Sequence, residues 1–187
     1  MGRSRTRAKS EIPTSARSGG ERAPTTTPAS ATLPRVWQGV GYRPLPDAGH
    51  ARPLFEFAAL PWPETDAIFL AWGAFAASSD GERLVGALVA ERAGSDAMVH
   101  GPVVIVETDP FEIAAQLVAA LLDHATASGV STVFTRPQGL DRVWVRYGFI
   151  PVPESTLPGG LARPAGAGLY AWRGGSALWT LREATPA

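Results

Sequence analysis

The side chains that can do chemistry in this sequence are carboxylates, arginines and three histidines, because the chain has no cysteine. The absence of cysteine excludes a thiol nucleophile, a disulfide scaffold and cysteine-ligated zinc or iron–sulfur sites. The histidines, at positions 50, 100 and 124, are too scattered for a metal site, so none is predicted. The chain therefore offers carboxylates and His100 for proton transfer, and arginines for phosphate binding.

Three of the carboxylates surround the predicted start of a long helix. Asp109 is expected as the N-cap, Pro110 suits the first helical position, and Glu112 follows the cap by three residues, as in a capping box. Gly129 supplies a stop, so the helix is predicted over residues 110–128. Its apolar residues repeat with helical spacing and form one continuous face: Ala114, Leu117, Val118, Leu121, Leu122 and Ala125.

Strands are predicted on both sides of this helix. The expected strands lie at residues 36–42, 67–75, 83–92, 97–106, 130–135, 149–153 and 169–173, with short helices after Asp47 and at 140–147. The strand–helix–strand order around the long helix implies a parallel, right-handed crossover. The fold class is therefore α/β, an α+β mixed sheet with an antiparallel N-terminal half and one parallel β-α-β crossover.

The length of 187 residues and the 45% of apolar residues predict one ordinary domain with a sizeable core. Residues 1–35 are rich in Arg, Ser, Thr and Pro and carry seven basic and two acidic residues, which predicts a disordered basic tail. The domain is expected over residues 36–187, where ten basic and fifteen acidic residues leave a net charge of −5. An acidic domain argues against nucleic-acid binding through the core.

No run of about 18 apolar residues is present, so no membrane span is predicted. No apolar segment follows the basic residues of the tail, as a secretory signal requires. We therefore expect a cytoplasmic protein. An organellar transit peptide, or a tail that touches nucleic acid or lipid, stays open for residues 1–35.

Two short motifs flank the long helix. The first reads VHGPVVIV at residues 99–106, and the second reads VWVRYGF at residues 143–149. With the element order, they resemble the GNAT family of N-acetyltransferases over about residues 36–175. The resemblance implies the GNAT fold, in which the fourth and fifth strands, here at 97–106 and 130–135, splay apart and acetyl-CoA lies between them.

Splayed parallel strands leave unpaired backbone N–H and C=O groups, which can bind the amide-bearing pantetheine arm of CoA. Arg136 can pair with a phosphate and Gln138 with a pantetheine amide, although a turn role fits Gln138 as well. Arg142 and Arg146 are interpreted as part of a solvated helix face. By the resemblance, acetyl-CoA is the acyl donor, and the residues expected to bind it are Val104, Ile105, Val106, Glu112, Ile113, Ala114, Arg136 and Gln138.

The sequence departs from the family at the loop that holds the pyrophosphate. That loop usually contains glycines, whereas residues 107–114 read ETDPFEIA. Pro110 removes one backbone donor, and Glu107, Asp109 and Glu112 place negative charge where phosphates would bind. We interpret this stretch either as a self-capped helix that has replaced the phosphate site or as a site that binds the cofactor differently.

The expected catalytic groups also depart from the family. Trp144 stands where many GNAT enzymes have the tyrosine that protonates the leaving thiolate, and an indole N–H does not give up a proton near neutral pH. Tyr147 is the nearby alternative, although its position also fits the core. Glu107 is the predicted general base, ahead of Glu91 and His100, because it follows the strand that borders the cofactor.

The favoured function is direct acyl transfer from acetyl-CoA to a primary amine. The acceptor, a small-molecule or peptide amine, and the oligomeric state are not determined by the sequence. The alternative is a catalytically inactive GNAT-like domain that serves as a binding or assembly module. The missing glycines and Trp144 favour that alternative. The resemblance of the fold does not decide between the two, because a fold does not by itself specify a function.

Overall fold

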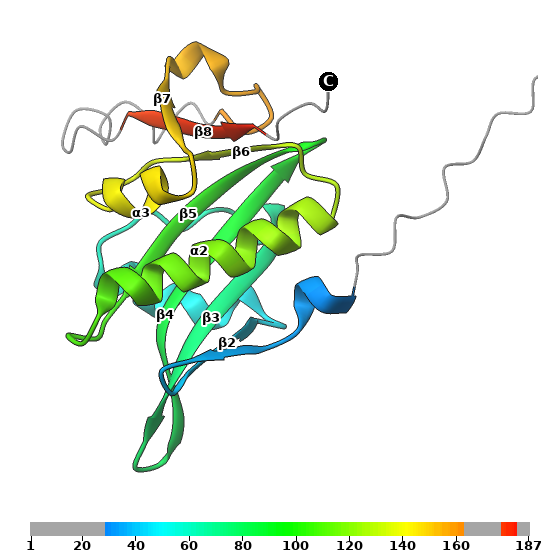
Figure 1. Cartoon of the computed structure of the whole chain (residues 1–187). Coiled ribbons are helices and arrows are strands. Elements are labelled where there is room, and N and C mark those ends of the chain that lie inside the picture. The colour runs from blue at the N-terminus through cyan, green and yellow to red at the C-terminus, as the bar shows by residue number, and fades with distance from the viewer. Residues whose placement is uncertain (1–28, 163–176, 183–187) are drawn as a thin grey trace, which may run out of the picture.

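The computed structural model of the protein describes residues 29–162 and 177–182. Figure 1 shows the fold and labels most of its α-helices and strands. The symbol η marks a 3-10 helix. In chain order the elements are η1 (Ala29–Thr32), β1 (Arg35–Trp37), β2 (Val40–Pro44), η2 (Ala48–Ala51), α1 (Arg52–Phe57), η3 (Thr65–Ala67), β3 (Ile68–Ser78), β4 (Gly81–Ala93), β5 (Asp96–Val104), α2 (Pro110–Ala127), β6 (Thr132–Thr135), α3 (Asp141–Arg146), β7 (Ile150–Val152), η4 (Glu154–Thr156) and β8 (Leu178–Arg182).

Within the described residues, eight strands form one sheet in the order β1-β2-β3-β4-β5-β6-β8-β7 (Figure 1). Every neighbouring pair is antiparallel except β5 and β6, which are parallel and connected through α2. This arrangement confirms the predicted fold class of a mixed sheet with an antiparallel first half and one parallel crossover. No helix in these residues is long and apolar enough to cross a bilayer.

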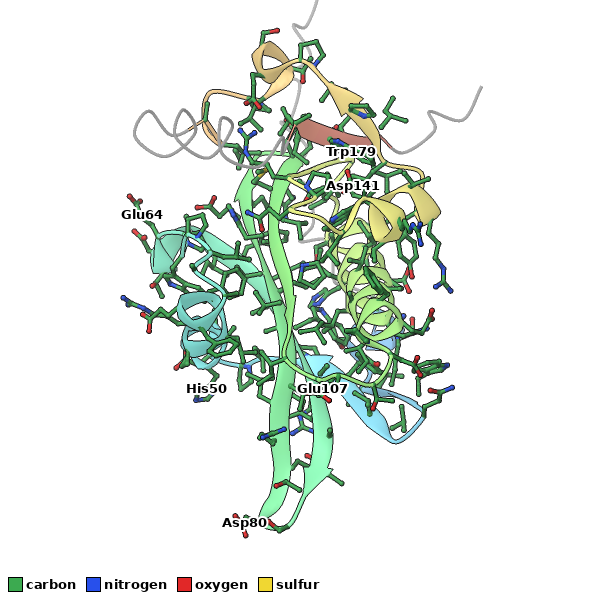
Figure 2. The ribbon with its side chains drawn as sticks, turned by 90° about the vertical axis from the view of Figure 1, so that its left-hand side faces the viewer. His50, Glu64, Asp80, Glu107, Asp141 and Trp179 are labelled. Atoms are coloured by element: carbon green, nitrogen blue, oxygen red, sulfur yellow. The ribbon has the colours of Figure 1, made fainter. Side chains whose placement is uncertain are left out.

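The sheet is covered on both faces, as Figure 2 shows, with α2 on one side and α1 with η2 on the other. On the α2 face, Leu117 and Leu121 are buried in the same cluster as Leu88 of β4. On the α1 face, Phe55 is buried with Val89, the next residue of β4. Successive residues of β4 therefore point to opposite faces, and each fully buried leucine stabilises the fold by about 1.5–3 kcal/mol.

The parallel pair of strands parts before β5 ends. Pairing stops at Val99 of β5 and Thr135 of β6, which is the last residue of β6. β5 continues, still paired on its other edge with β4 through Val103 and Val104. Over residues 100–104, the edge of β5 on the β6 side has no strand partner among the described residues. β6 is paired with β5 over its whole length and then ends, so the open edge expected of the predicted splayed strands is present because β5 is the longer strand.

Two local predictions are wrong. The single strand expected at 36–42 is a hairpin of β1 and β2, because Gln38 and Gly39, with φ of 46° and 77°, form a turn between them. Asp109 does not cap α2 with its side chain and has φ 50° and ψ 45°. An N-cap residue normally has extended dihedrals, whereas Asp109 is in the left-handed region, so the predicted capping box does not form.

The described domain extends beyond the predicted boundaries. η1 precedes Val36 and its Ala31 is buried, so residues 29–35 are structured although the sequence assigned them to the tail. Residues 1–28 of that tail and the strand predicted at 169–173 lie outside the described residues. The sequence did not predict β8, which pairs with β6 and β7.

Candidate active site

A cavity of about 300 Å³ lies where β5 and β6 part, and we call it the strand-edge cavity. Some of its lining residues lie near the end of α1, and others lie in α2. Because α1 and α2 cover opposite faces of the sheet, the cavity passes through the sheet. Its lining residues are Ala58, Leu60, Pro102, Val103, Val104, Pro110, Phe111, Ala114, Gln138 and Leu140. None of these side chains is charged, and the unpaired edge of β5 offers backbone hydrogen-bonding groups. The cavity therefore suits a neutral, amide-bearing chain.

The turn after β6 places Gln138 at this cavity. The N–H of Leu140 donates to the carbonyl oxygen of Pro137 at 2.9 Å, and the two residues between them have positive φ, 50° for Gln138 and 86° for Gly139. Positive φ is uncommon for a residue with a side chain, and such backbone strain clusters at functional sites. Gln138 also lines a second cavity, so this residue borders both.

The second cavity, of about 360 Å³, is called the polar cavity. Its walls come from the loop before β3, from β4 and β5, from the turn after β6 and from residues 154–162. The lining residues are Pro61, Trp62, Pro63, Glu91, Met98, Val99, His100, Arg136, Gln138, Glu154, Leu157, Leu161 and Ala162. The described residues contain no group of three or more side chains that could hold a metal ion.

Glu91 of β4 and His100 of β5 form a hydrogen-bonded pair at the polar cavity. Nε2 of His100 lies 2.9 Å from Glu91 Oε2, and because an ionised carboxylate can only accept a hydrogen bond, Nε2 is the donor in this pair. Glu91 is buried, and the His100 side chain is 21% exposed. With Nε2 protonated, a neutral imidazole keeps Nδ1 as a proton acceptor. A carboxylate that orients an imidazole in this way suits general-base chemistry.

Arg136, just after β6, and Glu154 of η4 form a second pair. Two guanidinium nitrogens of Arg136 donate to the two carboxylate oxygens of Glu154 at 2.6 and 2.7 Å. These hydrogen bonds lower the pKa of the Glu154 carboxyl below its ordinary value. The pair ties the end of β6 to the segment that covers the polar cavity through Leu157 and Leu161.

The predicted cofactor-binding residues are divided among different places. Ile105 is partly exposed beyond the end of β5, and Val106 and Ile113 line a third cavity beside the β1–β2 hairpin. Arg136 lines the polar cavity. Those that line the strand-edge cavity are Val104, Ala114 and Gln138.

The start of α2 carries acidic side chains that are already bonded or exposed. Glu112 accepts hydrogen bonds from Arg146 at 2.7 Å and from Gln116 at 2.9 Å, and these bonds, first that from Arg146, lower the pKa of its carboxyl. Glu107 and Asp109 are exposed nearby in the chain. The described residues therefore fit a neutral thioester arm in the strand-edge cavity, but they do not fit a pyrophosphate at this helix N-terminus.

None of the three predicted catalytic residues lines either cavity. Glu107, labelled in Figure 2, is exposed and lines neither. Trp144 is fully buried, with its ring centroid 4.9 Å from that of Phe149, and its indole N–H has no partner among the described residues. The Tyr147 hydroxyl donates to the carbonyl oxygen of Ala115 at 2.7 Å, and burial raises its pKa. Their catalytic roles stay predictions, and this placement favours structural roles for Trp144 and Tyr147.

Sequence reasoning missed several residues of the polar cavity, among them Trp62 and Glu154. Trp62 lies between two prolines and packs edge-on against Phe55, with ring centroids 5.1 Å apart. A large aromatic residue held between prolines in a loop is a signal that could have identified it. Glu154 lies between the strands predicted at 149–153 and 169–173, and nothing local in the sequence indicates its pairing with Arg136.

No family model and no curated protein matches this chain. Among solved structures, an acetyltransferase of the GNAT family from Staphylococcus aureus Mu50 shares 9% identity at a TM-score of 0.55, over 76% of this chain and 98% of its own. A GNAT family N-acetyltransferase from Escherichia coli in complex with CoA shares 18% identity at a TM-score of 0.52, over 79% of this chain and 83% of its own. N-acetylglutamate synthase from Neisseria gonorrhoeae, complexed with CoA and N-acetyl-glutamate, shares 16% identity at a TM-score of 0.56, over 81% of this chain but 36% of its own.

These similarities show that the chain has the GNAT fold. They confirm, at the level of the fold, the resemblance that the two motifs of the sequence indicated. At such low identity the chemistry of this chain depends on its own cavities.

Proposed function

We propose that the protein is an N-acyltransferase that moves an acyl group from a pantetheine thioester, with acetyl-CoA as the simplest donor, to a primary amine. The observation that carries this proposal is that a single residue after the end of β6, Gln138, lines both cavities. One cavity suits a neutral thioester arm, and the other presents a proton acceptor. Holding a donor and an acceptor side by side removes much of the entropic barrier to their reaction.

The donor substrate supplies an activated acyl carbonyl. The residues of this chain that would hold its arm are the unpaired backbone edge up to Val104, the wall at Ala114 and the carboxamide of Gln138. Arg136, a predicted phosphate partner, faces the polar cavity instead and is paired with Glu154.

The amine must lose a proton before its nitrogen attacks the acyl carbonyl. We assign this proton to Nδ1 of His100, while Glu91 holds the Nε2–H and stabilises the imidazolium. The C–N bond then forms and the C–S bond breaks. The leaving sulfur takes up a proton from solvent, and the nitrogen and the imidazolium of His100 each release one proton to solvent, which regenerates the base. We prefer this pair to Glu107 because both of its residues line the polar cavity.

Thermal unfolding with and without acetyl-CoA, together with thiol release in the presence of amines, tests the proposal. The chain has no cysteine, so the released thiol is measured without background from the protein. A ligand at 100 times its Kd stabilises a protein by about 2.7 kcal/mol, which gives a visible shift in Tm. Absence of a shift with any acyl-CoA at millimolar concentration would contradict the proposal and support the binding-module alternative.

A further inference from the structure

The polar cavity combines the hydrogen-bonded pair of Glu91 and His100 with apolar walls. Glu91 and His100 lie side by side on β4 and β5, while Trp62, Leu157 and Leu161 come from the segments on either side. A ligand that places one polar group near the Glu91–His100 pair would have the rest of its surface against apolar side chains. In such a cavity the polar groups orient the ligand, and the apolar walls provide most of the binding affinity.

The segment that covers the polar cavity is anchored. Leu161 is buried in a cluster with Met98 of β5, and Leu157 packs against that cluster. The bidentate Arg136–Glu154 pair holds the same segment to the end of β6. The apolar character of the cavity is therefore a fixed property of the described fold.

The charges that line the polar cavity disfavour some amines. A ligand carboxylate would meet Glu91 and Glu154, and the positive charge of Arg136 is already balanced by its ion pair with Glu154. A second ligand ammonium would lie against the apolar walls, where an unpaired charge is strongly unfavourable. One ammonium on an uncharged body meets neither penalty.

We propose that the polar cavity binds a primary monoamine whose amino group is attached to an uncharged, apolar body, such as an arylalkylamine. It selects against amino acids and polyamines. The amino group lies toward Glu91 and His100, and the body lies against Trp62, Leu157 and Leu161. The role of this ligand as acyl acceptor rests on the proposed function, whereas the selection is a property of the cavity.

Four matched ligands test this selection by calorimetric titration of the full chain without an acyl donor. 2-Phenylethylamine is compared with phenylalanine, which adds a carboxylate, with 2-phenylethanol, which lacks the amine, and with spermidine, which carries several ammonium groups. We expect 2-phenylethylamine to bind at least about tenfold more tightly than each of the others. Equal or tighter binding of phenylalanine or spermidine, or no binding of 2-phenylethylamine, would overturn the inference.

Trp62→Ala tests the assigned wall. We expect it to weaken binding of 2-phenylethylamine by about 10- to 100-fold, and that of n-propylamine, which leaves the wall largely uncovered, by less than about threefold. Phe57→Ala is the matched control, because Phe57 is an aromatic residue of α1 that is 81% exposed and lines neither cavity. An equal loss for both amines, or no loss for either, would show that Trp62 does not contact the ligand body.

An assay of thiol release from acetyl-CoA separates this inference from the proposed function. Selective binding of 2-phenylethylamine without amine-dependent thiol release would overturn the acyltransferase proposal and support the ligand class. Thiol release with amino acids or polyamines as the better acceptors would support the acyltransferase and overturn the ligand class. Neither binding nor release would overturn both.

Discussion

The two cavities that meet at Gln138 share one sheet but are formed by different parts of the chain. The strand-edge cavity exists because β6 stops at Thr135 while β5 continues to Val104, and its lining side chains are uncharged. The polar cavity depends on side chains that pair with each other, above all Glu91 with His100. Main-chain geometry thus forms the proposed donor site, and paired side chains form the proposed acceptor site.

This difference has consequences for substitutions. A site formed by a strand edge keeps its backbone hydrogen-bonding groups when one side chain is changed. A site formed by a buried pair is more sensitive, because removing one partner leaves the other without its hydrogen bond. We therefore expect larger effects in the polar cavity than in the strand-edge cavity.

The largest effect is expected from Glu91→Gln, which keeps the size and removes the carboxylate charge. Without that charge the imidazolium of His100 is less stable, so kcat/KM for thiol release should fall by about 10²–10⁴-fold. The paired variant Glu107→Gln changes an exposed carboxylate and should alter kcat/KM by about twofold or less. A larger loss in Glu107→Gln than in Glu91→Gln would restore the base predicted from the sequence.

Gln138→Gly is expected to have a smaller effect, at the point where the cavities meet. Loss of one carboxamide hydrogen bond should raise the KM for acetyl-CoA by about 2- to 12-fold, while glycine adopts the positive φ readily and keeps the fold. Gln38→Gly is the matched control, because Gln38 has φ 46° in the β1–β2 turn and lines neither cavity. If both variants raised KM equally, the effect would come from backbone flexibility and not from the carboxamide.

Glu154→Gln should affect only the binding of the amine acceptor. Loss of the ion pair with Arg136 should raise the KM for the amine by up to about fivefold and leave kcat unchanged. Because the pKa of Glu154 is lowered, the contribution of the pair is present above the ordinary carboxyl pKa and is lost as pH falls through the lowered value. The ratio of the KM values of variant and wild type, measured against pH, should therefore approach one in acid. A ratio independent of pH would rule out the ion pair as the cause.

The smallest effect is expected from removing the nucleotide part of the donor. Glu107, Asp109 and Glu112 lie at the start of α2, so S-acetyl-phosphopantetheine should retain kcat/KM within about threefold of acetyl-CoA. Added salt should not weaken acetyl-CoA binding, because it screens a repulsion. A loss of about 100-fold or more for the truncated donor, with acetyl-CoA binding that weakens as salt rises, would reveal a basic phosphate site.

The sequence predicted those parts of the fold whose signals are local. The apolar repeat from Ala114 to Ala125 identified α2, and the motifs at 99–106 and 143–149 indicated both the family and the parting strands. The β1–β2 hairpin was missed because Gln38 is an unusual residue for positive φ, so the turn looked like a continuing strand.

The site was less predictable than the fold because it depends on register. Glu91 and His100 share a face only because of the pairing of β4 with β5, which includes an irregularity between Ala87 and Val89. A slip of one residue in this register would move the side chains of one strand to the opposite face of the sheet. No pattern in a single sequence determines the register. Glu107 was favoured from its position at a strand end, but the structure places it outside both cavities.

Hydrogen exchange of the full chain with and without S-ethyl-CoA, a donor analogue without a transferable acyl group, tests most directly whether the parted strands receive the donor. We predict slower exchange over residues 100–104 and 137–140 at saturating analogue, because the unpaired edge of β5 and the turn at Gln138 gain partners. Unchanged exchange in both segments at saturation would contradict the account.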